Sequence, residues 1–169
     1  KNVLGEIVKE SEIDFTNLEV LAQVKDRLLL EDEQIIIVHT GAYVNTDKCE
    51  NLPYDAVKSN VLGTQYLVEL AKQTNAWFIH FSTTAIYDPD WYELSDGYFN
   101  EDCKIDSKTI YGLTKYNSQL VVKQSDLFTK IILQPVFIYG DAPNDNSSMI
   151  RKICEIIYCN KYLGMNLPK

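Results

Sequence analysis

The chain of 169 residues lacks the features that mark several large classes of protein. It contains no apolar run close to the roughly 20 residues that a membrane-spanning helix needs, and no signal peptide is visible at Lys1. Basic residues are not in excess, because Asp and Glu outnumber Lys and Arg and the net charge is −8. Nucleic acids and anionic membranes select basic surfaces, so we expect neither as a partner.

Residues that bind metals are also scarce. The four cysteines are Cys49, Cys103, Cys154 and Cys159, and no two of them form a CxxC pair. The two histidines, His39 and His80, lie in predicted strands, so we expect half-buried core residues with satisfied hydrogen bonds. Separate reduced thiols are typical of cytosolic proteins. We therefore expect a cytoplasmic protein with no metal site.

Apolar and charged residues occur at the frequencies of an ordinary globular protein, 46% and 24%. This length and composition predict a single domain, residues 1–169, in which residues 141–169 begin a substrate-binding region. Short β-branched runs alternate with helical apolar patterns. Strands are expected at residues 3–8, 35–38, 77–81 and 131–133, and helices from residue 18, over residues 57–72 and 111–123, and around residues 150–157.

The runs at residues 35–38 and 77–81 show no apolar–polar alternation, which is typical of strands buried on both faces. Such strands in alternation with helices predict the α/β class, with a doubly wound parallel sheet that is Rossmann-like. In these sheets ligands bind beyond the carboxyl ends of the strands. The residues that follow the predicted strands are Thr40, Gly41, Ala42, Ser82, Thr83, Thr84, Tyr139 and Gly140. The polar insertion at residues 88–109 is long enough to be a functional loop that borders the substrate.

One pair of residues suggests a specific chemistry. Tyr111 and Lys115 lie four residues apart, which places a phenol and an ammonium on one face if the segment is helical. With a hydroxyl such as that of Thr83, they suit proton exchange with a carbinol or carbonyl oxygen while a cofactor moves the hydride. Positive charge on Lys115 would lower the pKa of the tyrosine from about 10. On its own, this spacing also fits a plain solvated helix face.

Several stretches in one order resemble the extended short-chain dehydrogenase/reductase family. Residues 39–43 (HTGAY) are similar to the turn after its fourth strand, and residues 60–64 (NVLGT) to its NVxGT helix. Residues 81–87 (FSTTAIY) are similar to the strand that carries the catalytic hydroxyl, residues 111–115 to YxxxK, and residues 134–140 (QPVFIYG) to RPxxxYG. The resemblance implies a domain that binds NAD or NADP.

Within that family the chain is most similar to the dTDP-4-dehydrorhamnose reductase branch. The spacing of the branch's DKAE motif and of the helix after it is kept by Asp47, Lys48, Cys49, Glu50, Pro53, Ala56 and Asn60. Residues 13–17 (IDFTN) resemble its LDITD turn. In that turn the aspartate, here Asp14, contacts the adenine end of the cofactor.

The resemblance also implies roles for individual residues. Tyr111 would be the general acid/base, Thr83 would orient the substrate oxygen, and Lys115 would hold the nicotinamide ribose. Asn60 takes the family's helix-asparagine position and is counted with these catalytic residues. Cofactor contacts are implied for Asp14, Thr40, Gly41, Ala42, Tyr43, Ser82, Lys115, Pro135 and Val136. Substrate contacts are expected for Thr83, Thr84, Tyr87, Asn144 and Asn146.

The chain departs from the family in three places. The glycine-rich GxxGxxG turn, which presents backbone N–H groups to the cofactor's pyrophosphate, is absent. We expect the chain to begin after the family's second strand, with a sheet incomplete at the N-terminus and an exposed edge at residues 35–38. A second copy of the chain or a missing segment would cover that edge. Thr84 replaces an acidic residue, which argues against dehydratase chemistry.

The expected function is that of an NAD(P)-dependent reductase or epimerase acting on a nucleotide-linked sugar. Two alternatives stay open. Residues 41–45, 53–54 and 60–64 also resemble thioester reductase domains, which release carrier-bound acyl chains, although the loop between Asn45 and Pro53 is longer here. The missing glycine-rich turn also fits a regulatory subunit that binds dinucleotide without turnover, or part of a longer protein.

Overall fold

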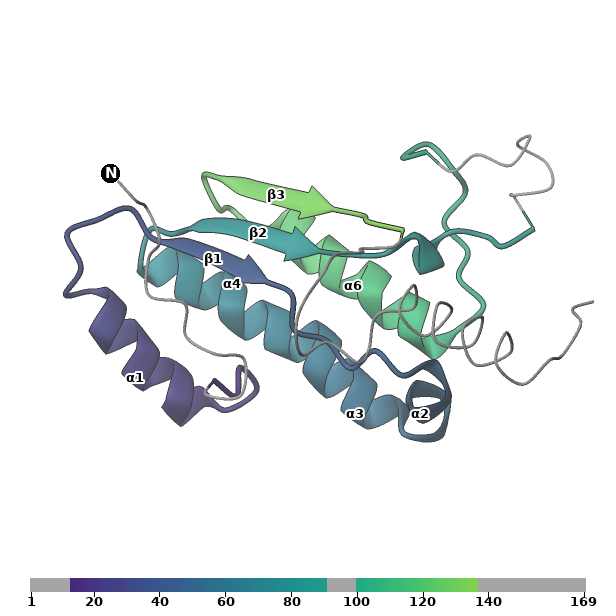
Figure 1. Cartoon of the computed structure of the whole chain (residues 1–169), viewed down its shortest axis with the longest axis horizontal. Helices are drawn as coiled ribbons and strands as arrows, with labels where there is room; N and C mark the ends of the chain where they lie inside the picture. The colour runs from purple at the N-terminus through teal and green to yellow at the C-terminus, as the bar shows by residue number, and fades with distance from the viewer. Residues whose placement is uncertain (1–12, 91–99, 137–169) are drawn as a thin grey trace, which may run out of the picture. The chain divides into compact units, whose positions relative to one another are not determined.

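Three parallel strands form one sheet, drawn from blue to green in Figure 1. The computed structural model describes residues 13–90 and 100–136. The strands are β1 (Ile36–His39), β2 (Trp77–Phe81) and β3 (Lys130–Leu133), in the spatial order β1-β2-β3. His80 lies in register with His39 on one side and Ile132 on the other. Helices occupy the connections between the strands, so the predicted α/β class with a parallel sheet is confirmed.

Some of the helices begin at polar caps that the sequence supplies. The helices in the described residues are α1 (Leu18–Leu28), α2 (Thr46–Asn51), α3 (Pro53–Val57), the π-helical turn η2 (Lys58–Leu62), α4 (Gly63–Gln73), the 3-10 turn η3 (Thr84–Ile86) and α6 (Ile110–Gln124). Asn17 caps α1, because its Oδ1 accepts from Glu19 N at 2.9 Å. The segment expected as a polar loop before Pro53 is instead helical, since the Asn45 side chain accepts from Lys48 N at 2.8 Å and starts α2.

One helical layer covers the sheet. In Figure 1, α1, α4 and α6 lie along the same side of the three strands. The apolar core between them is built on Phe78 of β2, which is fully buried. The other buried members of this core are Leu21, Leu67, Val68, Leu70, Ala71, Ala76, Val122 and Leu127. Burial of this apolar surface is the main driving force for the helices to pack on the sheet.

The other face of the sheet carries apolar side chains that remain accessible. Ile36 and Val38 of β1 are 50% and 54% exposed, and Ile131 of β3 is 47% exposed. The expectation that residues 35–38 and 77–81 are buried on both faces is therefore wrong for the described structure. The sequence pattern is apolar on both sides of these strands, but the described helices cover only one of them.

Within residues 13–90 and 100–136, β1 pairs with β2 alone, and the expected exposed edge at this strand stays a prediction. Several expectations lie outside the described residues: the strand at residues 3–8, the helix around residues 150–157, Tyr139, Gly140, Asn144, Asn146, Cys154 and Cys159. The chain divides into two compact units, Lys1–Pro135 and Val136–Lys169. Everything described below except Val136 belongs to the first. No helix of the described part is long and apolar enough to cross a membrane.

Candidate active site

Helix α6 carries the Tyr111/Lys115 pair, and its first turn is fixed from two sides. Thr109 caps the helix by accepting from Gly112 N at 3.0 Å. The Glu50 carboxylate, from α2, accepts from Ile110 N at 2.7 Å. A carboxylate at this end also interacts favourably with the helix dipole. The start of α6 is therefore tied to α2, 60 residues earlier in the chain.

Tyr111 and Thr83 come together beyond the end of β2. Both side chains are partly buried, and a hydrogen bond joins them. Thr83 Oγ1 also accepts from Ala85 N at 3.2 Å, which fixes the hydroxyl at the start of η3. The phenol and the hydroxyl therefore meet at this edge, whereas the Lys115 ammonium bonds the carbonyl oxygen of Phe81. Among the described residues, Tyr111 is not one of those that pack against the apolar clusters.

The pKa of Tyr111 lies above its ordinary value because burial disfavours the phenolate, and the hydrogen bond from Thr83 only partly opposes this. The expectation that Lys115 lowers this pKa is not met. The Lys115 Nζ atom donates to the carbonyl oxygen of Phe81 at 2.6 Å, so the ammonium is held at the end of β2. A neutral phenol at neutral pH suits a proton donor better than a proton acceptor.

Lys115 is a buried cation. Its side chain is only 3% exposed, and burial lowers its pKa from 10.5 to about 8. Such a group is still mostly charged at neutral pH but loses its charge in mildly alkaline solution. Desolvation of this kind clusters at functional sites.

Asn60 joins three elements through one carboxamide. Its Oδ1 accepts from Tyr43 N at 2.6 Å, and its Nδ2 donates to Tyr43 O at 3.2 Å and to Thr114 Oγ1 at 2.9 Å. The residue is 1% exposed and lies in the π-helical turn η2, a conformation that is rare and frequent at functional sites. Asn60 therefore fixes the loop after β1 against α6, and it acts on the site through its neighbours.

The predicted cofactor loop lies at the carboxyl end of β1. Thr40 is exposed, and Gly41, Ala42 and Tyr43 are partly exposed. The absence of a side chain at Gly41 leaves room for the Phe15 ring, which also packs edge-on against His39 with ring centroids 5.2 Å apart.

Three further predicted cofactor contacts lie in other parts of the chain. Asp14 is exposed and accepts from Thr16 N at 2.9 Å and Thr16 Oγ1 at 2.7 Å, and these bonds lower its pKa. Val136 is 65% exposed and Pro135 is partly buried.

Two predicted contact residues are turned inward. Ser82 is 7% exposed and donates to Gln119 Oε1 at 2.9 Å, and Tyr87 is 5% exposed and donates to Gln134 Oε1 at 3.2 Å. Gln134 Nε2 in turn donates to Gln119 Oε1 at 3.2 Å. Sequence reasoning missed both glutamines. The signal was the Gln-Pro pair at residues 134–135, where the related motif has Arg-Pro.

The two described ends of the polar insertion pack beside this network. Residues 87 and 105 form an antiparallel bridge, and Asp88 forms an ion pair with Lys104 at 3.4 Å. Cys103 is buried against Ile86 and Tyr87. The predicted contact residue Thr84 is partly exposed at the start of η3. Residues 91–99 of the insertion lie outside the described structure.

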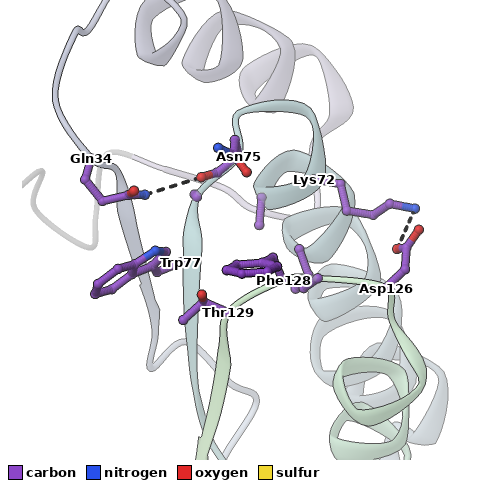
Figure 2. A pocket seen from close by; sticks show the side chains of 10 residues that line it. Gln34, Lys72, Asn75, Trp77, Asp126, Phe128 and Thr129 are labelled. Atoms are coloured by element: carbon purple, nitrogen blue, oxygen red, sulfur yellow. Dashed lines mark hydrogen bonds and ion pairs between the residues drawn. The ribbon is translucent and has the colours of Figure 1, made fainter.

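A separate pocket of about 360 Å³ lies at the opposite end of the strands. Figure 2 shows it between Trp77, which begins β2, and Phe128 and Thr129, which precede β3, with the Lys72–Asp126 ion pair at one side. No predicted site residue lines it. Chemistry based on Tyr111 and Lys115 therefore does not take place there. Among the described residues, no cluster of three or more His, Cys, Asp or Glu side chains could hold a metal ion.

Residues 3–155 match the protein family described as the RmlD substrate binding domain. The chain belongs to this family. It is 26% identical over 140 residues to dTDP-4-dehydrorhamnose reductase from Escherichia coli, a match that covers 82% of the chain and 44% of the relative. It is 28% identical over 121 residues to dTDP-glucose 4,6-dehydratase from Streptomyces antibioticus, covering 70% of the chain and 34% of the relative. The chain thus spans less than half the length of these relatives.

Solved structures show the same fold. dTDP-4-dehydrorhamnose reductase from Bacillus anthracis, in complex with NADP, superposes with a TM-score of 0.72 at 22% identity, over 88% of this chain and 49% of that one. RMD from Pseudomonas aeruginosa, complexed with NADPH, gives a TM-score of 0.70 at 13% identity, over 93% and 53% of the two chains. These likenesses confirm the Rossmann-like fold class.

Proposed function

We propose that this chain is the catalytic part of an NAD(P)-dependent oxidoreductase that reduces a carbonyl group on a nucleotide-linked sugar. The observation that carries the proposal is the hydrogen-bonded Thr83–Tyr111 pair, one helical turn from the buried cation of Lys115. The family match and the reductases among its relatives support the substrate class. Epimerase chemistry would use the same three residues.

In this proposal Tyr111 gives its proton to the carbonyl oxygen of the substrate. Its raised pKa keeps the phenol protonated at neutral pH, as a reduction requires. Thr83 shares a hydrogen bond with the phenol and orients the same substrate oxygen. When bound, a reduced nicotinamide supplies the hydride that goes to the carbonyl carbon, so the product is the alcohol.

The residues at this edge suit the nicotinamide half of a dinucleotide. Lys115 offers a charged donor between β2 and α6, and Asn60 holds the backbone of Tyr43 in place. Lys115 would bind the nicotinamide ribose, and residues 40–43 would border the cofactor. Asp14 would contact the adenine end. Neighbours solved in complex with NADP and NADPH support a nicotinamide dinucleotide as the cofactor.

The deciding experiment is a fluorescence titration of NADPH and NADH into the chain, with Lys115→Met and Tyr111→Phe in parallel. We expect saturable binding that weakens about tenfold or more in Lys115→Met, because a charged donor is lost. Tyr111→Phe should keep its affinity. Lys123→Met is the matched control, since Lys123 lies in the last turn of the same helix and is exposed.

Turnover is the second measurement, with dTDP-4-dehydro sugars as substrates and NADPH oxidation as the signal. Tyr111→Phe should lose activity while it still binds NADPH. Binding without turnover on any nucleotide sugar would favour the regulatory alternative. Reduction of a carrier-bound thioester, with no reaction on sugars, would favour the thioester reductase alternative. No binding of either dinucleotide would contradict the proposal for this chain.

A further inference from the structure

Three consecutive residues of β2 and its end are bonded to the buried face of α6. Phe81 O accepts from Lys115 Nζ at 2.6 Å, His80 Nε2 bonds Ser118 Oγ at 3.1 Å, and Ser82 Oγ donates to Gln119 Oε1 at 2.9 Å. His80 is fully buried. Of residues 80–82, His80 is the one whose side chain titrates near neutral pH in water. It has no part in the proposed chemistry.

The hydrogen bonds fix which nitrogen of His80 carries the proton. Ser118 Oγ donates its hydrogen to Lys115 O at 2.8 Å, so it must accept from His80 Nε2–H. Nδ1 is then the unprotonated nitrogen, with a lone pair. Within the described residues, it is the one buried side-chain nitrogen or oxygen that has no hydrogen-bond partner. A buried acceptor of this kind costs stability unless something donates to it.

Among the described residues, the titratable groups that act on His80 are Lys115 and His39, and only one of them is a candidate donor to this lone pair. From β1, His39 lies with its ring centroid 5.2 Å away, but its Nε2 bonds Thr64 Oγ1 at 2.9 Å. Thr64 comes from α4 and donates to Asn60 O at 2.7 Å. From β3, the neighbour in register is Ile132, which cannot donate. The remaining charged group is the Lys115 ammonium from α6.

Lys115 and His80 also influence each other electrostatically. Burial and, next, the positive charge of Lys115 lower the pKa of His80 to about 2, so the imidazole stays neutral and keeps its lone pair. The ammonium has three N–H donors, and Phe81 O accepts one of them. A buried cation is stabilised by each further acceptor within reach.

We propose that His80 is a positioning residue for Lys115, and that its Nδ1 accepts a hydrogen bond passed on from the ammonium through one bound water molecule. Buried waters usually satisfy such unpartnered polar groups. In the charged state Lys115 would then be held by Phe81 O on one side and by His80 on the other. The consequence for cofactor binding rests on the function proposed above, but the contact itself does not.

Two amide variants separate the two ring nitrogens. His80→Asn places an amide oxygen near the position of Nδ1 and gives up the bond to Ser118. His80→Gln places an amide nitrogen near the position of Nε2, which keeps the donor to Ser118 and gives up the acceptor at Nδ1. A residue that only packs α6 on β2 would tolerate His80→Gln better than His80→Asn.

The readout is the pKa of Lys115 in the cofactor-free chain, measured by NMR on lysine labelled with ¹³C at Cε. Loss of an acceptor disfavours the ammonium, so His80→Gln should lower this pKa by about one pH unit, while His80→Asn leaves it close to that of the unchanged chain. An unchanged pKa in His80→Gln, or equal shifts in both variants, would overturn the proposal. Lys123 gives an internal reference signal on the same helix.

A second measurement needs no variant, so it can be made even if both variants fail to fold. The ¹⁵N shifts of His80 in the unchanged chain should show Nε2 protonated and Nδ1 hydrogen-bonded as an acceptor. A free Nδ1, or the opposite tautomer, would refute the contact. Neither measurement uses NADPH, so failure of the proposed oxidoreductase function and failure of this contact would be told apart.

Discussion

The side chain of Asn60 bonds both backbone groups of Tyr43, at 2.6 Å to the amide nitrogen and 3.2 Å to the carbonyl oxygen. A backbone that follows a strand end normally leaves these groups to water. Here one carboxamide satisfies both and still donates to Thr114 on α6. The loop after β1 and helix α6 are therefore held by the same side chain, in the π-helical turn η2.

The variant Asn60→Asp keeps the shape of this side chain and removes its donors. A carboxylate would face the Tyr43 carbonyl and the Thr114 oxygen, which already donates to Tyr111 O at 2.8 Å. We expect a loss of about 3 kcal/mol in the free energy of unfolding, measured by urea denaturation. NADPH affinity should fall with it. Asn117→Asp is the matched control, because Asn117 donates to Leu113 O from an exposed position and should cost well under half as much.

Gly112 sets how closely α6 approaches the turn after β2. A Cβ there would collide with the carbonyl oxygen of Ala85 and the side chain of Ser107. Glycine to alanine inside a helix normally stabilises by about 1 kcal/mol, but Gly112→Ala should destabilise by about 1–3 kcal/mol and separate Tyr111 from Thr83.

The effect of Gly112→Ala is tested by measuring both turnover and the free energy of unfolding. Leu113→Ala, at an exposed neighbouring position, should have little effect on either. Adding Ser107→Ala to Gly112→Ala should recover only part of the loss, because the Ala85 carbonyl belongs to the backbone. Full recovery would show that the backbone contact is unimportant.

The elements of this fold could be predicted from the sequence because their patterns are local. The run at residues 77–81 gave β2 with the same bounds, and the helix expected over residues 111–123 is observed as α6 (Ile110–Gln124). The Thr83–Tyr111 contact could also be predicted from the sequence, since the carboxyl ends of parallel strands lie at one edge of the sheet. The burial of residues 35–38 could not be predicted in this way, because whether the second face of the sheet is covered depends on elements other than the strand itself.

The interior of the site escaped prediction for a related reason. Nothing in the spacing of residues along the chain shows that His80 bonds Ser118, or that Gln119 accepts from both Ser82 and Gln134. The raised pKa of Tyr111 depends on burial, which spacing does not give. The second copy or further segment over the β1 edge and the cytoplasmic location stay predictions.

Phe15 and Gly41 should behave as a coupled pair. A Cβ on Gly41 would lie 2.6 Å from Phe15 Cε1, and a Cβ on Gly63 would lie 2.6 Å from the other edge of the same ring. Gly41→Ala should therefore destabilise by about 1–3 kcal/mol through overpacking.

The double variant Phe15→Leu/Gly41→Ala should recover much of this loss, with a coupling energy of about 1 kcal/mol or more in a double-mutant cycle. Phe15→Leu should rescue Gly63→Ala in the same way, because the smaller side chain frees space on both sides of the ring. Additive effects of the two substitutions would mean that the ring does not fill the space between the glycines.

The buried histidine pair should make the fold sensitive to mild acid. Burial, followed by the charge of Lys115, lowers the pKa of His39 to about 3, and the same two causes, together with His39, lower that of His80 to about 2. Below about pH 6.5 the two imidazoles bind protons in the unfolded chain but not in the folded chain. The free energy of unfolding therefore falls as the pH falls. Two such groups give a slope that approaches about 2.7 kcal/mol per pH unit.

Urea denaturation at pH values from about 7 down to about 5 would measure this slope, because few carboxyl groups titrate in that range. His39→Gln keeps a donor for Thr64 and removes one titrating group, so its slope should be about half as steep. Lys115 contributes in a different window, since its pKa of about 8 lies below that of a free lysine and its effect appears only in alkaline solution. A chain whose stability is flat between about pH 7 and about pH 5 would show that the two imidazoles take up protons in the folded chain as readily as in the unfolded chain. The arrangement of His39, His80 and Lys115 described above could not then hold.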